Sequence, residues 1–494
     1  MKLETLIENL QYKELINFED VEITGISYNS KTTKSGDLFV CLVGEHSDGH
    51  EYFKSAVECG ARAFMVEKEL DCHLPQVVVS STRRQIADVA DKFYHSPSKS
   101  LNVIGITGTN GKTTVTHLVQ KIVEAKKEKD GSQGKCALIG TLGYKLSSKD
   151  DYKEAKHTTP QAPELQAVLD TILKSKIKNV VMEVSSHALE QNRVGGCDFK
   201  GAVLTNLTQD HLDYHITMDN YFESKAILFK SLKAGDFAVI NADDEYAQKF
   251  FDIIDKGVNI LTYGIKKPAD IMAKNVEFSL SGAEFTCETN KFGSEKVKLH
   301  MNGMFSVYNV LAAIAVGLAL DVKLESCIKP LEGTRGVAGR FEVIAKNPLV
   351  IVDYAHTPDG LENVLTAAKE ITPKDSKLIC LFGCGGDRDS TKRPKMGAIA
   401  ERISDKIVIT SDNPRSEDPQ QIITDVLSGL KSINTQTVFV EADRKKAIEL
   451  LKNICEKNDV IVIAGKGHED YQILKDKTIH FDDREEAKKV FLGA

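Results

Sequence analysis

Apolar residues gather in short runs along residues 101–338, and the segments between these runs have helical periodicity. The runs at 101–106, 180–184, 202–204 and 237–240 have strand length. Between them, apolar residues recur every three or four positions, as they do in helices with one buried face. Short apolar runs that alternate with such helices predict a largely parallel sheet covered by helices.

The same alternation starts again after residue 340. Five apolar runs are separated by amphipathic segments of helix length, as repeated βαβ units would produce. This pattern predicts a second, doubly wound sheet of the Rossmann type. The glycine-rich segment 331–340 disfavours a continuous helix and marks a boundary between the two series. The five runs are 349–352, 378–382, 407–409, 437–440 and 460–464.

Residues 1–98 contain shorter strand-like runs, at 37–43, 63–66 and 77–79. They end in the polar stretch HSPSKS, which is typical of a linker. The chain has 494 residues, and single cores rarely grow beyond about 250–300 residues, so several domains are expected. We predict three α/β domains: a smaller one at 1–98, a central one at 99–338 and a Rossmann-like one at 339–494.

Composition narrows the class of protein. Apolar residues make up 41% of the chain, charged residues 27%, and the formal net charge is -7, which disfavours binding to bare nucleic acid. The ten cysteines are scattered without a C-x-x-C pair, so neither a zinc site nor a disulfide framework is indicated. The N-terminus lacks a signal-peptide pattern, and no apolar run approaches about 18 residues. We expect a cytoplasmic protein without membrane insertion.

The segment ITGTNGKTT at 106–114 has the features of a phosphate-binding loop. It follows an apolar run, precedes a helical pattern and nearly fits G-x-x-x-x-G-K-[ST], with isoleucine in place of the first glycine. Gly108 and Gly111 would let backbone amides approach phosphate oxygens at the positive end of the next helix. Lys112 would supply a cation and Thr113 a ligand for Mg²⁺. The sequence therefore predicts a site for a nucleoside triphosphate with Mg²⁺, in a P-loop ATPase-like domain.

Three further segments of this domain carry candidate chemistry. Glu183 closes an apolar run, and a carboxylate there is costly unless it binds metal or is satisfied in the core; Mg²⁺ ligation is the interpretation we favour. His211 and His215 have i, i+4 spacing, but leucine stands where a zinc peptidase has glutamate, so that class is disfavoured. For His215 a purely structural role stays open. Lys225 would by default be a solvated helix cation.

Four polar loops follow predicted strands of residues 339–494. In doubly wound sheets, ligands bind beyond the carboxyl ends of the strands. One polar loop is ordinary, but four on one rim with this many charged and histidine side chains favour a binding site. The loops are 353–359, 383–389, 411–419 and 464–470, with the side chains His356, Arg388, Arg415, Lys466, His468 and Glu469.

The chain resembles the Mur ligases, because its motifs occur in the order seen in that family. They are TGTNGKTT, MEVSSHAL, LTNLTQDHLDYH, FESKAILF, HMNGMFSVYNVLAA, GRFE, DYAHTPD, SDNPRSEDP and GKGHE, spread over nearly the whole chain. The resemblance implies an ATP-dependent ligase of peptidoglycan precursor synthesis that acts on small molecules. The γ-phosphate would go to a carboxylate, and an amine would attack the resulting acyl phosphate.

By motif position, the resemblance implies roles for named residues. The catalytic set would be Lys112, Glu183, His211 and Lys225, with Lys225 modified to N6-carboxylysine by CO₂. Mg²⁺ would be held by Thr113, Glu183, His211 and Lys225. ATP would contact Gly108, Thr109, Asn110, Gly111, Lys112, Thr113, Thr114, Asn302, Arg340 and Asp353, with Asn302 near the adenine. Arg340 and Asp353 belong to the third domain, so domain closure would complete the site.

The resemblance also places a UDP-muramoyl-dipeptide substrate across the first two domains. Segment 27–52 matches the UDP-binding pattern, with Ser30 as the expected contact. Many members have D-S-R where this chain has Asn29, Ser30 and Lys31, and lysine lacks the planar fork of arginine, so the roles of residues 29 and 31 stay open. The implied dipeptide-binding residues are Thr158, Thr159, Ser185, Gln191 and Arg193.

Members of the family add either meso-diaminopimelate or L-lysine to that dipeptide, and the two differ by one carboxylate. Arg415 offers a bidentate donor for the extra carboxylate, which favours diaminopimelate. The alternative is a surface cation paired with Glu417 or Asp418. The implied site consists of Arg388, Asp412, Asn413, Pro414, Arg415, Gly465 and Glu469, with Glu469 meeting an ammonium group.

Three other functions stay open at this point. A lysine-adding homologue would share most of the motifs. A folylpolyglutamate synthetase uses a related phosphate loop and the same acyl phosphate strategy, but the DNPR and SDGHEY segments argue against a pterin site. A non-catalytic nucleotide-binding module would not need the four implied catalytic residues together. We expect a monomer.

Overall fold

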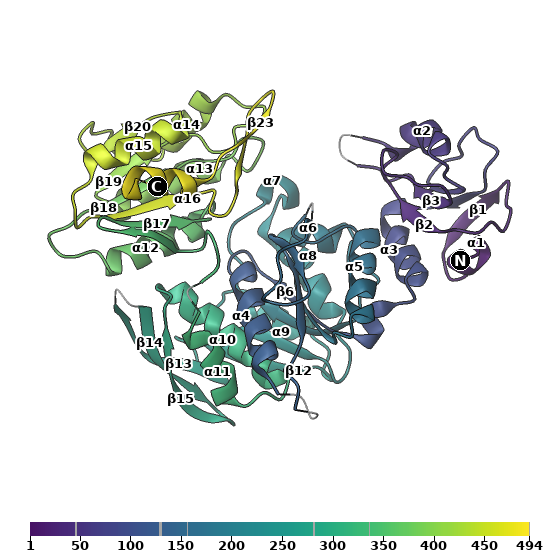
Figure 1. The fold of residues 1–494 in the computed structure, drawn as a ribbon, viewed down its shortest axis with the longest axis horizontal. Coiled ribbons are helices and arrows are strands. Elements are labelled where there is room, and N and C mark those ends of the chain that lie inside the picture. The colour runs from purple at the N-terminus through teal and green to yellow at the C-terminus, as the bar shows by residue number, and fades with distance from the viewer. Residues whose placement is uncertain (45–46, 128–130, 156, 280–281, 335, 494) are drawn as a thin grey trace.

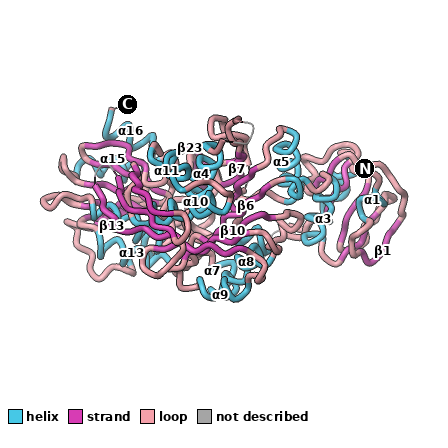
Figure 2. Tube along the Cα trace, turned by 90° about the horizontal axis from the view of Figure 1, so that it is seen from below, coloured by secondary structure: helices cyan, strands magenta, loops and turns pink. Residues whose placement is uncertain are grey.

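The computed structural model describes residues 1–44, 47–127, 131–155, 157–279, 282–334 and 336–493. Figure 1 shows three α/β parts in chain order, and Figure 2 shows the N-terminal part at one end of an elongated molecule. Each part has its own sheet and apolar core, which confirms the predicted α/β class with three domains. Among the described residues, no helix is both long enough and apolar enough to cross a membrane.

The N-terminal part is built on a five-stranded sheet. Its elements are α1 (Leu3–Ile7), β1 (Tyr12–Ile16), β2 (Gly25–Ser27), β3 (Asp37–Val40), η1 (Gly49–Tyr52), α2 (Phe53–Glu58), β4 (Ala63–Val66), β5 (Gln76–Val79) and α3 (Thr82–Phe93). The strand order is β1-β5-β4-β3-β2, and only β1 is antiparallel. Strands β3, β4 and β5 are fully buried, which is why their apolar runs are visible in the sequence, whereas β1 is mostly exposed and β2 is only partly buried.

The central part contains a ten-stranded sheet and the phosphate loop. Its strands are β6 (Asn102–Thr107), β7 (Cys136–Gly140), β8 (Gly143–Lys145), β9 (Asn179–Glu183), β10 (Phe199–Leu204), β11 (Phe237–Asn241), β12 (Asn259–Gly264), β13 (Ile271–Ser279), β14 (Gly282–Thr289) and β15 (Gly293–Leu299). Its helices are η2 (Pro97–Ser100), α4 (Lys112–Ala125), α5 (Ala162–Lys174), α6 (Ser186–Glu190), α7 (Leu212–His215), α8 (Met218–Lys230), α9 (Ala247–Ile253), α10 (Met304–Ala319) and α11 (Leu324–Glu332).

The middle of this sheet is parallel, as predicted, and helices cover both faces. The strand order is β15-β14-β13-β12-β11-β10-β6-β9-β7-β8. Helices α4, α10 and α11 form one core with it, and α5, α8 and α9 form the other. Both edges are antiparallel: β8 pairs with β7, and β13, β14 and β15 form a meander. The meander was not predicted, because β13 and β15 alternate buried and exposed positions or are mostly exposed, which leaves no apolar run.

The C-terminal part is a doubly wound sheet, as the repeated βαβ pattern predicts. Its elements are β16 (Glu342–Lys346), β17 (Leu349–Asp353), α12 (Pro358–Glu370), β18 (Leu378–Phe382), α13 (Lys392–Ile403), β19 (Lys406–Ile409), α14 (Pro419–Leu427), β20 (Val438–Val440), α15 (Arg444–Ile454), β21 (Val460–Ala464), β22 (Tyr471–Ile473), β23 (Thr478–His480) and α16 (Asp483–Leu492). The strand order is β16-β17-β21-β18-β19-β20, with α12, α13 and α14 in one core and α15 and α16 in the other.

Two joints connect the three parts. At the first, α3 packs against α5, and the Tyr28 hydroxyl donates to Glu164 Oε1 at 2.5 Å. The polar stretch predicted as a linker folds into η2, where Pro97 and Ser98 are buried. At the second, the Asn110 side-chain amide of the phosphate loop donates to Asp359 Oδ2 on α12 at 2.7 Å. The carboxyl edges of the central and C-terminal sheets therefore face each other across a shared space.

Candidate functional site

The phosphate loop between β6 and α4 depends on two glycines. Gly108 has φ +146°, and a Cβ there would lie 1.8 Å from Thr205 Oγ1. Gly111 has φ +85°, and a Cβ there would lie 2.4 Å from Asn309 Oδ1. Only glycine fits both the left-handed backbone and the space. The loop therefore passes closely over β10 and α10, and it ends where α4 begins with its free amide groups.

Two lysines converge on one carbonyl of this loop. Lys112 Nζ donates to the backbone oxygens of Gly108 and Thr109 at 2.9 Å each. Lys225 Nζ donates to the same Gly108 oxygen at 3.0 Å, and its side chain is 1% exposed. Burial lowers the pKa of Lys225 well below its usual range, and the nearby Lys112 lowers it further. The default interpretation of Lys225 as a solvated helix cation is therefore wrong.

Glu183, at the end of β9, is buried and fully hydrogen-bonded. Its Oε2 accepts from Thr113 Oγ1 at 2.9 Å and from Thr141 Oγ1 at 3.0 Å, while its Oε1 accepts from the Thr141 amide at 2.9 Å. The carboxylate is thus satisfied by protein donors, one of the two interpretations left open by the sequence. Within the described part of the chain, no group of three or more His, Cys, Asp or Glu side chains could hold a metal ion.

His211 lies at the joint between the central and C-terminal parts, next to Asp210. Its Nε2 is 3.2 Å from Asp210 Oδ2, and this buried carboxylate also lies 3.9 Å from His356 Nε2 and from Lys392 Nζ of the C-terminal part. Burial would raise the pKa of Asp210, but His211, Lys392 and His356 hold it well below its usual range. Asp210 therefore stays ionised and attracts cations from across the joint.

His215 has the structural role that the sequence left open. It is 3% exposed, and its two ring nitrogens contact Ser186 Oγ at 2.9 Å and Ser224 Oγ at 3.2 Å. Burial lowers its pKa to about 4, so the ring is neutral at pH 7. The ring joins α6 to α8, and this contact helps to fix the helix that carries Lys225.

A cavity of about 380 Å³ lies over the phosphate loop and extends to the C-terminal part. It brings together six of the predicted ATP-binding residues: Asn110, Gly111, Thr113, Thr114, Arg340 and Asp353. The guanidinium of Arg340 stacks on Tyr354, 4.4 Å from the ring centre, and donates to Thr113 Oγ1 at 3.4 Å. Asp353 Oδ2 accepts from the Phe341 amide at 2.7 Å. The third part thus contributes directly to this cavity.

Asn302 does not line the cavity, although the resemblance placed it near the adenine. It is buried just before α10, and its Oδ1 has no hydrogen-bond partner among the described residues. Phe305, Tyr308 and Asn309 of α10 line the cavity instead. Their signal in the sequence is the HMNGMFSVYNVLAA motif, in which an aromatic residue recurs three positions later on the same helix face.

The predicted dipeptide-binding residues form a connected group, with one exception. Arg193 donates to Gln191 Oε1 at 2.6 Å and to the Thr159 carbonyl at 3.2 Å. Thr159 Oγ1 in turn accepts from the Ser185 amide at 3.1 Å. Thr158 Oγ1 lies 3.2 Å from Thr141 Oγ1, beside the carboxylate at the end of β9. Ser30 stands apart, buried in the N-terminal part after β2.

A second cavity, of about 280 Å³, lies between His211 and the loops of the C-terminal part. Arg415 is half-buried at its wall with φ +53°, an uncommon conformation for a residue other than glycine. Its Nη1 donates to the Gly386 carbonyl at 2.8 Å. Predicted residues in this wall are His211, Arg388, Asp412, Asn413, Arg415, Gly465 and Glu469. Pro414 is buried behind them and does not line it.

The interpretation of Arg415 as a partner of nearby acids does not hold. Glu417 makes two hydrogen bonds of 2.8 Å to Arg393, and Asp418 caps α14 by accepting from the Gln420 amide at 3.0 Å. Arg415 makes no ion pair among the described residues. Burial lowers the pKa of Arg415, and the nearby Arg388 lowers it further, while Asp412, Glu469 and Asp387 act in the opposite direction.

Glu469 lines the same cavity, at a corner where it lies close to Asp412 and Lys466. Lys466 Nζ lies 3.3 Å from both Glu469 Oε2 and Asp412 Oδ1, so one buried ammonium serves two carboxylates. Asn413 Nδ2 donates to Glu469 Oε2 at 3.0 Å. Burial raises the pKa of Glu469, and Asp412 raises it further. A second cation in the cavity would therefore be favourable. Gly465, with φ +120°, leaves room for this corner.

Sequence reasoning missed several residues that connect the cavities across the joint. Asp210, Asp359, Tyr354 and Lys392 received no role, although Asp210 and Asp359 stand inside the motifs TQDHLDYH and DYAHTPD. Their acidic character was visible, but the partners lie about 150 to 250 positions away in the chain. A contact over that distance leaves no local signal in one sequence.

Comparisons with known proteins agree with this geometry. Three family models match in order: Mur ligase family, catalytic domain, at residues 22–94; Mur ligase middle domain at 106–317; and Mur ligase, glutamate ligase domain, at 339–467. A curated UDP-N-acetylmuramoyl-L-alanyl-D-glutamate--2,6-diaminopimelate ligase from Bacillus cereus is 44% identical over 501 residues, which cover 100% of this chain and 99% of that protein. The chain belongs to the Mur ligase family.

Solved structures place this Mur ligase among proteins of the same fold. One, described as a UDP-N-acetylmuramoyl-L-alanyl-D-glutamate--2,6-diaminopimelate ligase, has 32% identity and a TM-score of 0.68, and the match covers 100% of this chain and 99% of that one. A folylpolyglutamate synthase from Mycobacterium tuberculosis has 17% identity and a TM-score of 0.64, covering 78% of this chain and 92% of that one. The second likeness shows a shared fold alone.

Proposed function

We propose that this Mur ligase uses ATP to join meso-diaminopimelate to the D-glutamate γ-carboxylate of UDP-N-acetylmuramoyl-L-alanyl-D-glutamate, in peptidoglycan precursor synthesis. The full-length similarity to a ligase of that name supports the reaction. The choice of amino acid rests on Arg415, an unpaired guanidinium in the wall of the second cavity. A carboxylate on the distal carbon would meet this group, and lysine has none.

ATP would lie in the cavity over the phosphate loop, with its phosphates toward Lys112 and the start of α4. The loop amides and the helix end favour phosphate oxygens, and Lys112 is already held in place by two carbonyls. Arg340 reaches Thr113 from the C-terminal part, where it would face the transferred phosphoryl group. Donors fixed before the reaction can stabilise the charge that develops on that group.

The donors at the end of β9 fit Mg²⁺, because Glu183 and Thr113 both offer oxygen ligands to a hard cation. When bound there, Mg²⁺ would neutralise charge on the phosphate oxygens. His211 stands beside Asp210 at the joint and would be a further ligand of the same ion. Glu183 would keep the hydrogen bond from the Thr141 amide, which fixes its orientation.

Lys225 would carry the carbamate. Its Nζ is held against the Gly108 carbonyl in a buried position, 4.5 Å from the centre of the Tyr221 ring. The amine nitrogen would bond to the carbon of CO₂, one N–H proton would leave to water, and a carboxylate would result. That change places an anion beside the Lys112 ammonium, which would attract it, and would offer Mg²⁺ a further oxygen ligand.

The incoming amino acid would lie in the second cavity, between Arg415 and Glu469. Its distal carboxylate would meet Arg415, and a distal ammonium would meet Glu469, where two carboxylates share a single lysine. The reacting amine would then point toward the joint, where the acyl phosphate is expected. Lysine would leave the Arg415 guanidinium desolvated and unpaired, so discrimination on the order of 10⁴ is expected.

The test is phosphate release from ATP with UDP-N-acetylmuramoyl-L-alanyl-D-glutamate as acceptor. Three reactions would be compared, with meso-diaminopimelate, with L-lysine and with no amino acid, and the product mass would be checked. We expect release and a tripeptide product only with diaminopimelate. A product with lysine alone would keep the ligase but contradict the role of Arg415. If none of the three reactions released phosphate, the result would contradict the proposed activity and favour a folylpolyglutamate synthetase or a non-catalytic protein.

A further inference from the structure

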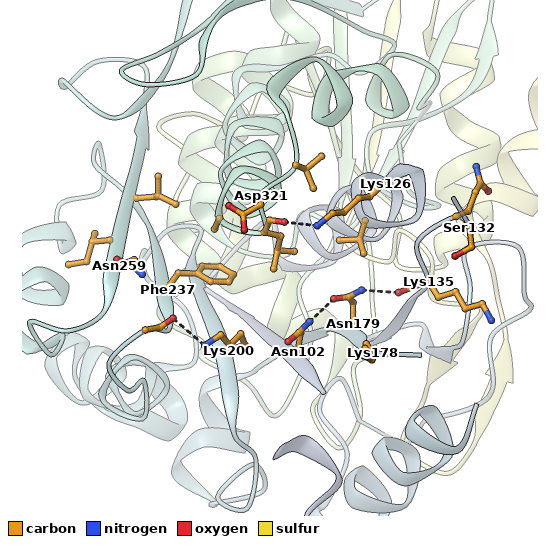
Figure 3. A pocket seen from close by; sticks show the side chains of 18 of the residues that line it. Asn102, Lys126, Ser132, Lys135, Lys178, Asn179, Lys200, Phe237, Asn259 and Asp321 are labelled. Carbon is orange, nitrogen blue, oxygen red and sulfur yellow. Dashed lines mark hydrogen bonds between the residues drawn. The ribbon is translucent and has the colours of Figure 1, made fainter. Parts of the chain in front are cut away.

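A larger cavity, of about 1030 Å³, opens at the opposite edge of the central sheet (Figure 3). Asn102, Asn179, Phe237 and Asn259 line it, and these are the first residues of β6, β9, β11 and β12. The ATP cavity lies beyond the last residues of the same strands. In parallel sheets substrates bind at the carboxyl edge, so this second location is separate from the ligase chemistry.

The wall of this amino-edge cavity is basic. Among the described residues it contains six lysines and a single acidic residue, Asp321, in a chain that has more acidic than basic residues overall. No arginine lines it among the described residues. The six lysines are Lys126, Lys135, Lys176, Lys178, Lys200 and Lys291. Like charges gathered around a concave surface raise the local concentration of anions.

Two of these lysines have a partner for their ammonium group, and the other four have none among the described residues. Lys126 Nζ donates to the Leu320 carbonyl at 2.8 Å, and Lys200 Nζ pairs with Asp236 at 2.8 Å. In the described part of the chain, the remaining four make no ion pair or side-chain hydrogen bond. These four are Lys135, Lys176, Lys178 and Lys291. Among the described residues, no ion pair offsets their charges.

The backbone at the centre of the cavity is rigid. Asn102 Nδ2 donates to Asn179 Oδ1 at 3.0 Å, and Asn179 Nδ2 donates to the Lys135 carbonyl at 3.2 Å, as Figure 3 shows. The Asn102 amide donates to the Lys178 carbonyl at 2.7 Å. Lys135 and Lys178 therefore stand at fixed backbone positions, each directly before one of the two neighbouring strands β7 and β9.

The floor of the cavity is apolar, in contrast to its rim. Val123, Val322 and Phe237 are buried beneath it, and Ile260 is 38% exposed at its surface. A ligand made only of charged groups would leave this floor unused. A ligand with a ring and several negative charges would cover the floor and meet the lysines. Lysine ammonium groups bind phosphate oxygens as point charges, so a phosphorylated ligand matches this rim.

We propose that the amino-edge cavity binds a phosphorylated small molecule with an aromatic ring, of the nucleoside diphosphate or triphosphate class. The volume is at the upper end of the range of about 300–1,000 Å³ usual for small-molecule sites, so such a ligand fits. Helix α4 connects this cavity to the phosphate loop, because it begins at Lys112 and ends beside Val123. The proposal does not depend on which amino acid the ligase adds.

The test is equilibrium dialysis of the full chain with ADP. We expect two classes of site, a tighter one at the phosphate loop and a weaker one at the amino edge. The double variant K135Q/K178Q removes two unpaired lysines and should weaken the second class on the order of tenfold or more, while the first class is unchanged. The matched control K445Q/K446Q removes two exposed lysines of α15, outside the cavity, and should leave both classes unchanged.

Three results of the dialysis experiment would overturn the proposal. They are a single class of ADP site in the parent chain, a second class that K135Q/K178Q leaves intact, and an equal loss in the control variant. Hydrogen exchange gives an independent readout, because ADP at high concentration should protect the amides at the starts of β6 and β9. Unchanged exchange there would also contradict binding. Inorganic triphosphate serves as the probe without a ring, and affinity equal to that of ADP would overturn the aromatic part of the proposal.

Discussion

The two edges of the central sheet both present lysines, but they hold them in opposite ways. At the carboxyl edge, Lys112 and Lys225 donate to one carbonyl oxygen and each has a single position. At the amino edge, Lys135 and Lys178 are exposed, and within the described ranges they have no partner for their charge. The first arrangement fixes geometry, which a reaction needs. The second supplies charge without fixed geometry, which suffices to attract an anion.

The largest expected effect is the loss of Lys225 at the carboxyl edge. Lys225→Ala should lower kcat by about 10²- to 10³-fold, because it removes the group proposed to carry the carbamate. Added acetate or formate should restore part of the activity by supplying a carboxylate. Lys230→Ala, on the exposed face of the same helix, is the matched control and should keep full activity. Full activity in Lys225→Ala would contradict the carbamate role.

Arg415 tests whether the C-terminal part, which faces the carboxyl edge of the central sheet, fixes the amino acid. Arg415→Ala should raise the KM for diaminopimelate by about 10²-fold, since a charge-assisted pair is lost, and should change the KM for ATP little. Steady-state kinetics with each substrate varied in turn would measure both values. Arg402→Ala, an exposed arginine paired with Glu362 on the surface, is the control. Equal small changes in both constants would remove Arg415 from the site.

Much of this carboxyl edge was predictable from sequence, because strands end where apolar runs end. The phosphate loop and Glu183 follow such runs in the central sheet, and the four C-terminal loops follow them in the C-terminal sheet. The parallel topology brings each set to the carboxyl edge of its own sheet. The burial of Lys225 was not predictable. On α8 it is one charged residue in an amphipathic helix, and only the packing of that helix under the phosphate loop shows that it faces inward.

The amino edge was invisible to the same reasoning. Its lysines stand before strands or after helices, where charged residues are ordinary, and each reads alone as a solvated side chain. The antiparallel meander and β8 were also missed, because they bury one face only. For Asn302 the motif implies an adenine contact, and because the structure buries this residue outside the cavity, its role stays a prediction. The pattern of apolar residues in the sequence predicts which residues are buried, but it does not predict which residues far apart in the chain are in contact.

The buried carboxylate of Asp412, in the C-terminal part, should make the stability of the fold depend on pH. Burial would raise the pKa of Asp412, but Lys466 and Arg444 hold it below its usual range. A depressed carboxyl pKa stabilises the fold above the unfolded value of about 3.9, and this contribution disappears as the pH falls through the lower folded pKa. Asp412→Asn should therefore cost about 2 kcal/mol of unfolding free energy at pH 7.

The cost of Asp412→Asn should be the same at pH 5.5 and should shrink below about pH 4, where the carboxyl of the parent chain takes up a proton. Urea unfolding of the two chains at each pH would measure the difference. Asp375→Asn, at an exposed position, is the control and should cost little at any pH. A cost that grows as the pH falls would contradict the proposed stabilisation by Lys466 and Arg444.

The smallest expected effect separates two explanations of the amino-edge lysines. Helix C-termini attract cations, and Lys126 and Lys176 follow the ends of α4 and α5, so part of the basic wall could serve the helices. Lys178 stands directly before β9 and away from a helix end. Without ligand, Lys178→Gln should change the unfolding free energy by less than about 0.5 kcal/mol, toward greater stability, because it relieves repulsion among unpaired charges. Thermal unfolding at low salt would resolve the sign, and the gain should vanish at about 1 M salt, where charges are screened. A clear loss of stability would mean that Lys178 stabilises the fold. The lysines at the amino edge would then be structural residues and would not serve to attract an anion.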